Sequence, residues 1–120
     1  MQKEKILIYD FKRGFSRFIK LRLSAKYEFE IFNNKSLLKD LKIDEHLAVI
    51  MIIADYTDLV DLLYIHSRTK NIIVFCEIEA IKYKIYDLED IILLDLNKIK
   101  KELLIDIKTN FDLFLELKIK

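Results

Sequence analysis

Five short apolar runs, separated by segments with helical spacing, constrain the fold more than any other feature of this sequence. The runs cover residues 5–9, 27–32, 47–54, 72–76 and 91–94. Apolar runs of this length are typical of strands, and strands that alternate with helices form a mostly parallel sheet. Because crossovers between parallel strands are right-handed, the sequence predicts a doubly wound α/β fold: a five-stranded parallel sheet, (βα)5, with helices on both faces.

The second and third runs differ in how their apolar residues are arranged. Apolar and polar residues alternate in 27–32, which predicts an edge strand with one face in water. The run 47–54 is continuous and rich in Ile and Val, which predicts a strand that is covered on both faces.

Five helices are expected between and after these strands. The first carries a stripe at helical spacing, the second is short, the third begins at an N-cap, the fourth is weak and the fifth is long. The first helix has its apolar stripe at Phe15, Phe18, Ile19 and Leu23, and the second covers residues 36–41. The third places Leu59, Leu62, Leu63 and His66 on one face, with Thr57 or Asp58 as its N-cap, and the fourth covers residues 79–86. The fifth has its N-cap at Asn97 and faces inward with Leu103, Ile107, Phe111 and Phe114.

Length and composition limit the classes of protein to which this chain is expected to belong. The 120 residues, 52% of them hydrophobic, predict a single domain over 1–120 with no output domain, and the apolar run 47–54 is too short to span a bilayer. A single cysteine, Cys76, fits a cytoplasmic protein. One glycine and no proline exclude glycine-rich nucleotide loops. The net charge of +1 argues against a dedicated nucleic-acid binder.

One segment departs from this charge balance. Six basic residues and no acid lie between Phe11 and Tyr27. A solvated helix face explains them, and docking on an acidic partner, a membrane surface or RNA is the alternative.

Three stretches of the chain resemble the receiver domain of response regulators in two-component phosphorelay signalling. They are Lys5-Ile-Leu-Ile-Tyr-Asp10, the stretch 27–41 that begins Tyr-Glu-Phe-Glu, and Asp58-Leu-Val-Asp-Leu-Leu-Tyr-Ile65. The resemblance extends over nearly the whole chain and implies a flavodoxin-like fold. It is carried mostly by the hydrophobic pattern, which other flavodoxin-like domains share.

The resemblance also implies a phosphoacceptor site, and most of its chemistry is altered here. Asp10 matches the first of the two acids that hold Mg²⁺, whereas Phe11 stands in the place of the second. Cys76 replaces a hydroxyl residue, and Asp95 stands about where the phosphate-contacting lysine belongs. An acid at that place would repel a phosphoaspartate, so conventional phosphorylation is not expected.

The position of the acceptor aspartate is ambiguous. Counting forward along the third strand places it at Asp55, and counting back from the match at Asp58 places it near Ile52. A Mg²⁺ site at Asp10 and Asp55 is one interpretation. In the other, Asp10, Asp55, Glu77 and Asp95 are ordinary acids that are solvated or cap helices.

The sequence favours a degenerate receiver that binds a protein, with no enzymatic activity and no required cofactor. The expected partner is a signalling protein or histidine kinase, and the interface candidates are Tyr83, Tyr86, Phe111 and Phe114. Residues 113–119 hold more apolar side chains than one helix face can hide. The segment is therefore expected either to end as an irregular tail or to pack against a partner or a second copy, as in a homodimer through the C-terminal helix.

Two alternatives remain. The first is a receiver that retains Mg²⁺ or phosphoryl binding at Asp10 and Asp55. The second is a small flavodoxin-like ligand-binding domain that uses the crevice at the carboxyl ends of the strands. An edge plugged by Phe11 would favour the interaction module, and an open apolar cavity would favour the ligand-binding domain.

Overall fold

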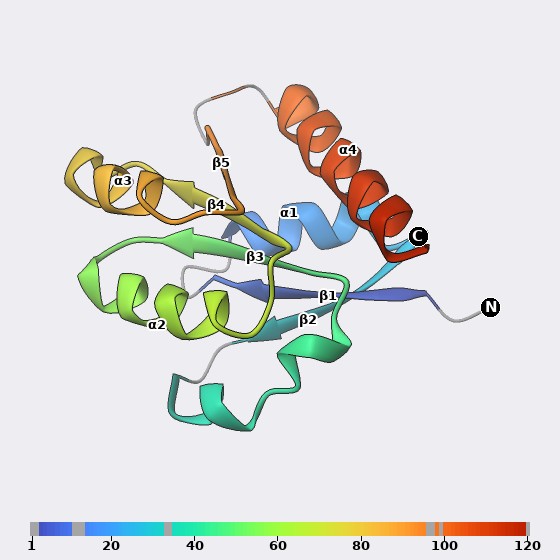
Figure 1. Cartoon of the computed structure of the whole chain (residues 1–120). Helices are drawn as coiled ribbons and strands as arrows, with labels where there is room; N and C mark the ends of the chain where they lie inside the picture. Colours follow the sequence, from blue (N-terminus) through green and yellow to red (C-terminus); the bar gives the residue numbers. More distant parts are fainter. Residues whose placement is uncertain (1–2, 11–13, 33–34, 96–97, 99, 120) are drawn as a thin grey trace.

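The chain folds around one parallel sheet with helices on both faces (Figure 1). The computed structural model describes residues 3–10, 14–32, 35–95, 98 and 100–119. The elements follow in the order β1 (Glu4–Tyr9), α1 (Gly14–Leu23), β2 (Tyr27–Phe32), η1 (Lys35–Asp40), η2 (Ile43–Glu45), β3 (Ala48–Ile53), α2 (Tyr56–His66), β4 (Ile72–Cys76), α3 (Glu79–Tyr86), β5 (Ile91–Leu94) and α4 (Lys100–Ile119).

The strand order is β2-β1-β3-β4-β5, and every neighbouring pair is parallel. This order confirms the predicted doubly wound, flavodoxin-like topology. From β1 the chain first crosses to β2 on one side and then returns to β3 on the other side. The carboxyl ends of β1 and β3 therefore flank the point where the strand order reverses, which is where open α/β sheets bind ligands.

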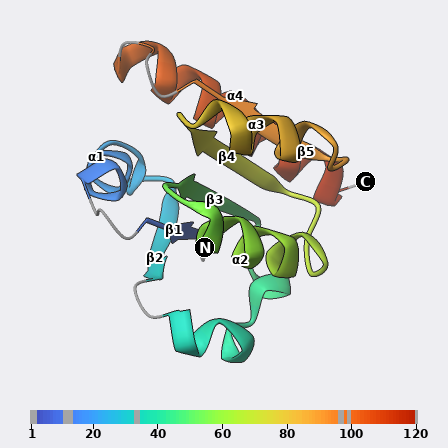
Figure 2. The same ribbon diagram turned by 90° about the vertical axis from the view of Figure 1, so that its left-hand side faces the viewer.

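Two apolar layers fill the space between the sheet and its helices. Alternate residues of the strands face opposite sides, so that Leu7 and Tyr9 belong to one layer and Ile6 and Ile8 to the other. Side chains of α2 and α3 complete the first layer, and those of α1 and α4 complete the second. Figure 2 looks onto the edge where the strands end and shows α1 and α2 on opposite sides of the sheet.

The strands agree with the sequence pattern. β2 lies at an edge of the sheet, where Tyr27 and Phe29 are buried and Glu28 and Glu30 are exposed. β3 lies inside the sheet between β1 and β4, and most of its side chains are buried. β5 forms the other edge, and all four of its apolar side chains are half-buried.

Two of the expected helices differ from the prediction. Residues 35–40 form a 3₁₀ helix, a form found in short helical pieces such as this one. In α2 the buried residues are Asp58, Leu62 and Ile65, whereas Leu63 is exposed and the N-cap is Asp55. The apolar pattern did not indicate this buried face, because the first residue of the face is the acid Asp58.

The last helix corrects two interface candidates. α4 is one continuous helix that buries Leu103, Ile107, Phe111 and Phe114, as its stripe predicted. The prediction that Phe111 and Phe114 form an interface is therefore wrong, because both rings belong to the core. Phe111 packs edge-on against Tyr27, with ring centroids 4.8 Å apart. The predicted N-cap Asn97 lies outside the described residues.

None of the helices in the described part of the chain combines the length and the apolar character needed to cross a bilayer.

Candidate functional site

Asp10, the acid that follows β1, connects the sheet to the start of α1. Its side chain is almost fully buried, and its Oδ2 atom accepts a hydrogen bond of 2.9 Å from the backbone N–H of Ser16. Ser16 lies in the first turn of α1, where N–H groups have no partner within the helix. Asp10 thus stabilises a helix N-terminus, where a negative charge is favourable.

Asp55 caps α2. Its Oδ1 atom accepts hydrogen bonds from the backbone N–H groups of Thr57, at 2.9 Å, and Asp58, at 3.1 Å. The side chain of Asp58 in turn accepts from the backbone N–H of Asp55, at 3.2 Å, which completes a capping box. The interpretation of Asp55 as a helix-capping acid is confirmed.

The most buried carboxyl group of α2 is one that the sequence analysis took only as a candidate cap. Asp58 is 4% exposed, and its Oδ2 atom also accepts the backbone N–H of Ala54 at 2.8 Å. Its Oδ1 atom accepts the hydroxyl of Tyr9 at 2.8 Å, and that hydroxyl lies 2.5 Å from Asp61 Oδ2. Burial and the two neighbouring carboxyl groups raise the pKa of Tyr9 well above its usual range. This cluster joins β1 to α2.

A spacing signal for this cluster was present in the sequence. Asp58 and Asp61 are three residues apart, so a helix places them on one face, and Leu62 and Ile65 continue the buried side. What the sequence did not indicate was the partner, since Tyr9 lies 49 residues away from Asp58.

Cys76, at the end of β4, is buried, and its Sγ atom lies 3.7 Å from the carbonyl oxygen of Ile78. Burial raises the pKa of its thiol, which keeps the sulfur protonated and weakly nucleophilic at neutral pH. The structure therefore favours a packing role for Cys76.

The remaining phosphoacceptor positions do not assemble a metal site among the described residues. Asp95 and Glu77 are exposed, Ile52 lies half-buried in β3, and Phe11 falls outside the described residues. Within residues 3–10, 14–32, 35–95, 98 and 100–119, no three acidic, His or Cys side chains converge as metal ligands. Mg²⁺ requires about six oxygen ligands. Asp10 and Asp55 are both directed at helix N-termini.

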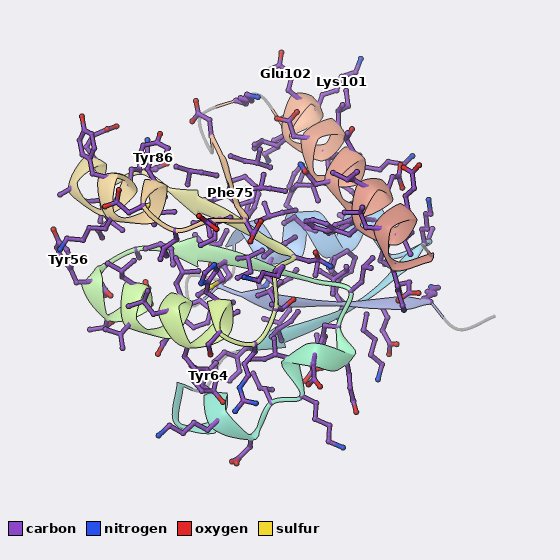
Figure 3. All side chains as sticks on the ribbon, viewed as in Figure 1. Tyr56, Tyr64, Phe75, Tyr86, Lys101 and Glu102 are labelled. Carbon is purple, nitrogen blue, oxygen red and sulfur yellow. The ribbon has the colours of Figure 1, made fainter. Side chains whose placement is uncertain are left out.

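A cavity of about 410 Å³ lies at this same edge of the sheet. It is bordered by the end of β1, the end of β3, the end of β4 with the residues after it, and the start of α1. The described residues that line it are Asp10, Gly14, Phe15, Ile52, Ile53, Ala54, Phe75, Glu77 and Ile78. Phe15 and Phe75 meet edge to face with centroids 4.8 Å apart, and Figure 3 shows Phe75 near the centre of the molecule. The wall is mainly apolar, with two acids.

A second feature lies on the surface of α3. Tyr83 and Tyr86 are 70% and 66% exposed, and their rings are 6.5 Å apart. The Nζ atom of Lys84, from the same helix, lies 5.9 Å from the ring centroid of Tyr56, which is also exposed. Figure 3 shows Tyr56 and Tyr86 on the same side of the molecule. We call Tyr56, Tyr83 and Tyr86 the tyrosine surface.

No protein-family model matches this chain, and a search of curated proteins found no similar sequence.

Proposed function

We propose that this chain is an atypical, receiver-like module of the cytoplasm that acts by binding a protein partner. The partner would be a signalling protein or a histidine kinase, and the module itself would have no catalytic activity. The observation that carries the proposal is the tyrosine surface, which places three exposed aromatic side chains on neighbouring helices.

Aromatic exposure of this kind is a feature of protein interfaces. Tyrosine is enriched there because its large, rigid ring buries much surface at a low cost in conformational entropy. Tyr83 and Tyr86 leave most of their surface in water, whereas Tyr9 and Tyr27 are buried in the core. A protein partner that covers these rings would remove their apolar surface from water.

The chemistry at the carboxyl edge supports an activity that does not depend on phosphorylation. The Asp55 carboxylate is engaged in capping α2, and Ile52 occupies the other candidate acceptor position. The thiol of Cys76 has a raised pKa and stands where a hydroxyl group would assist phosphoryl transfer. None of these three side chains suits a conventional phosphoacceptor cluster.

Affinity capture with matched variants tests the partner. Lysate of the source cell would be passed over the immobilised domain, over a Tyr83→Ser/Tyr86→Ser variant and over Leu21→Ser, with bound proteins quantified by mass spectrometry. Leu21 is a suitable control because it is 78% exposed on α1, which packs on the opposite face of the sheet. We expect a protein that the wild type and Leu21→Ser retain and the double variant loses. Equal capture by all three would contradict the proposal.

A second experiment tests whether the site still accepts a phosphoryl group. Amide NMR spectra would be recorded during titration with Mg²⁺ and beryllofluoride, which mimics an aspartyl phosphate. We expect no saturable shifts near Asp10, Asp55 and Cys76. Shifts centred on these residues would instead support a receiver that retains Mg²⁺ and phosphoryl binding.

A further inference from the structure

The exposed side of α2 has an unusual composition for the surface of a helix. It presents Tyr56, Val60 and Leu63 to water, at exposures of 53%, 65% and 49%. The buried side, in contrast, holds the carboxyl group of Asp58. None of the exposed residues between positions 56 and 67 is charged. A helix that packs by one face normally carries its charged residues on the opposite face, and α2 does not. We call Tyr56, Val60 and Leu63 the α2 stripe.

The spacing of the α2 stripe matches the seam of a coiled coil. Val60 follows Tyr56 by four residues and Leu63 follows Val60 by three, which is the alternation of the a and d positions in a heptad. A β-branched residue at one of these positions and leucine at the other favour pairing with one further helix. Because a row of side chains on one helix fits the grooves of another, the stripe is suited to a helical occupant.

Two cations border the α2 stripe, one near each end of the helix. The Nζ atom of Lys84, from α3, lies 5.9 Å from the ring centroid of Tyr56 in the first turn of α2. The guanidinium carbon of Arg68 lies 5.5 Å from the ring centroid of Tyr64 in the last turns. Figure 3 labels both tyrosines, which are eight residues or about 12 Å apart along the helix. Both cations are exposed, and neither forms an ion pair with another residue in the described part of the chain.

These two charges disfavour a second copy of the chain as the occupant. An antiparallel pair of α2 helices would bring Lys84 of one copy near Arg68 of the other. A parallel pair would bring each cation near its own equivalent. Like charges meet in both arrangements, which is unfavourable at an interface. An occupant with a carboxylate near each end would instead pair with both cations.

From these observations we propose that the α2 stripe binds an amphipathic helix of a protein partner, with apolar residues at heptad spacing and a carboxylate near each end. The apolar row packs against Val60 and Leu63, and the carboxylates lie near Lys84 and Arg68. This inference rests on the proposed function, because Tyr56 belongs both to the tyrosine surface and to the α2 stripe. It adds the secondary structure and the charge of the partner.

A library of displayed peptides tests the inference with a probe of known chemistry. Each peptide would be a helix of about 18 residues, or about five turns, with Leu at every a and d position. The e and g positions would be randomised among Glu, Gln and Lys, and the library would be selected on the immobilised whole chain. We expect Glu to be enriched over Lys. Replacement of the selected Glu by Lys should weaken binding by at least about tenfold, because like charges across an interface are unfavourable.

Variants of exposed apolar residues locate the binding surface. Val60→Ser/Leu63→Ser should lose the selected peptides, because it removes the apolar row from α2. Leu21→Ser should retain them, because Leu21 is exposed on α1, which packs on the opposite face of the sheet. Dispersed amide NMR spectra would show that both variants are folded.

Charge variants identify the source of the preference for Glu. Lys84→Glu/Arg68→Glu should reverse the selection, so that Lys is enriched over Glu. Asp87→Asn changes another exposed charge of the same region, three residues after Lys84, and should leave Glu preferred.

Several results would overturn the inference. They are the absence of any selected peptide, a selection without a preference for Glu, and retention of the selected peptides by Val60→Ser/Leu63→Ser. Sedimentation adds two more. A dimer of the wild type that this double variant lacks would assign the stripe to a second copy. Binding to phosphatidylserine vesicles that the double variant lacks would assign it to a membrane surface.

The peptide selection and the capture from lysate fail independently of each other. A partner that is captured through Tyr83 and Tyr86, together with a failed peptide selection, would contradict this inference and leave the proposed function standing. Equal capture by all three chains, together with a successful selection, would contradict only the assignment of the partner to Tyr83 and Tyr86.

Discussion

At the scale of the residue, the side chain that connects most groups is Asp58. It is buried and accepts hydrogen bonds from the Tyr9 hydroxyl and from the backbone N–H groups of Ala54 and Asp55. Replacement of Asp58 by Ala would leave these donors without the carboxyl group, at a cost of about 1–3 kcal/mol for a buried group. We expect Asp58→Ala to lower the free energy of unfolding by about 3 kcal/mol in urea denaturation.

Asp55, the N-cap of α2, provides the matched control for this prediction. Asp55 is exposed, and loss of an N-cap costs about 1 kcal/mol, because water can replace the cap. Asp55→Ala should therefore destabilise the protein clearly less than Asp58→Ala. Equal losses in the two variants would show that the contact between β1 and α2 contributes little to stability.

At the scale of the element, α4 separates a buried side from an exposed one. Phe111 is completely buried against Tyr27 and Phe29, whereas Leu117, in the last turn of α4, is 59% exposed. Phe111→Ala should cost about 3–5 kcal/mol of unfolding free energy, because it leaves a cavity in the core. Leu117→Ala should change stability by less than about 0.5 kcal/mol, as surface substitutions do.

The exposed side of the same helix is where the sequence predicts a homodimer interface. Leu113 and Leu117 are exposed on α4, and a second copy that covered them would make the apparent stability depend on protein concentration. Thermal melts of the wild type and of Leu117→Ala over a hundredfold range of concentration provide the measurement. Concentration-independent melting of both would exclude a dimer through this surface in that range.

At the scale of the whole molecule, two buried tyrosines connect stability to alkaline pH. Burial raises the pKa of Tyr27 to about 12, with a further contribution from Asp112, and burial also raises the pKa of Tyr9. A tyrosine in the unfolded chain titrates near about 10. Between these values the unfolded state releases the proton while the folded state keeps it, so stability falls as the pH rises.

We expect the free energy of unfolding to be insensitive to these two groups below about pH 10. Above that, Tyr27 alone should lower it by about 1.4 kcal/mol per pH unit up to about pH 12. Urea denaturation at several pH values gives the slope. Tyr27→Phe should reduce it, whereas Tyr83→Phe should not, because that ring is exposed to water in both states. An unchanged slope in Tyr27→Phe would contradict the assignment.

Local patterns in the sequence determined the elements of this fold. The alternation in β2, the continuous apolar run of β3 and the stripe of Leu103, Ile107, Phe111 and Phe114 each depend on residues that are neighbours in the chain. Periods of about 2 and 3.6 residues follow directly from backbone geometry. Together with the right-handed crossover they were sufficient to predict a doubly wound parallel sheet.

Only the tertiary structure decided how distant side chains meet. The hydrogen bond between Tyr9 and Asp58 joins residues 49 positions apart, and the cavity is formed by four separate segments. The burial of Phe111 and Phe114, rather than their exposure at an interface, likewise depends on how α4 lies on the sheet. The physical reason is that a periodic pattern indicates which face of an element is apolar. The partners of that face, and the volume left between them, depend on how the elements pack.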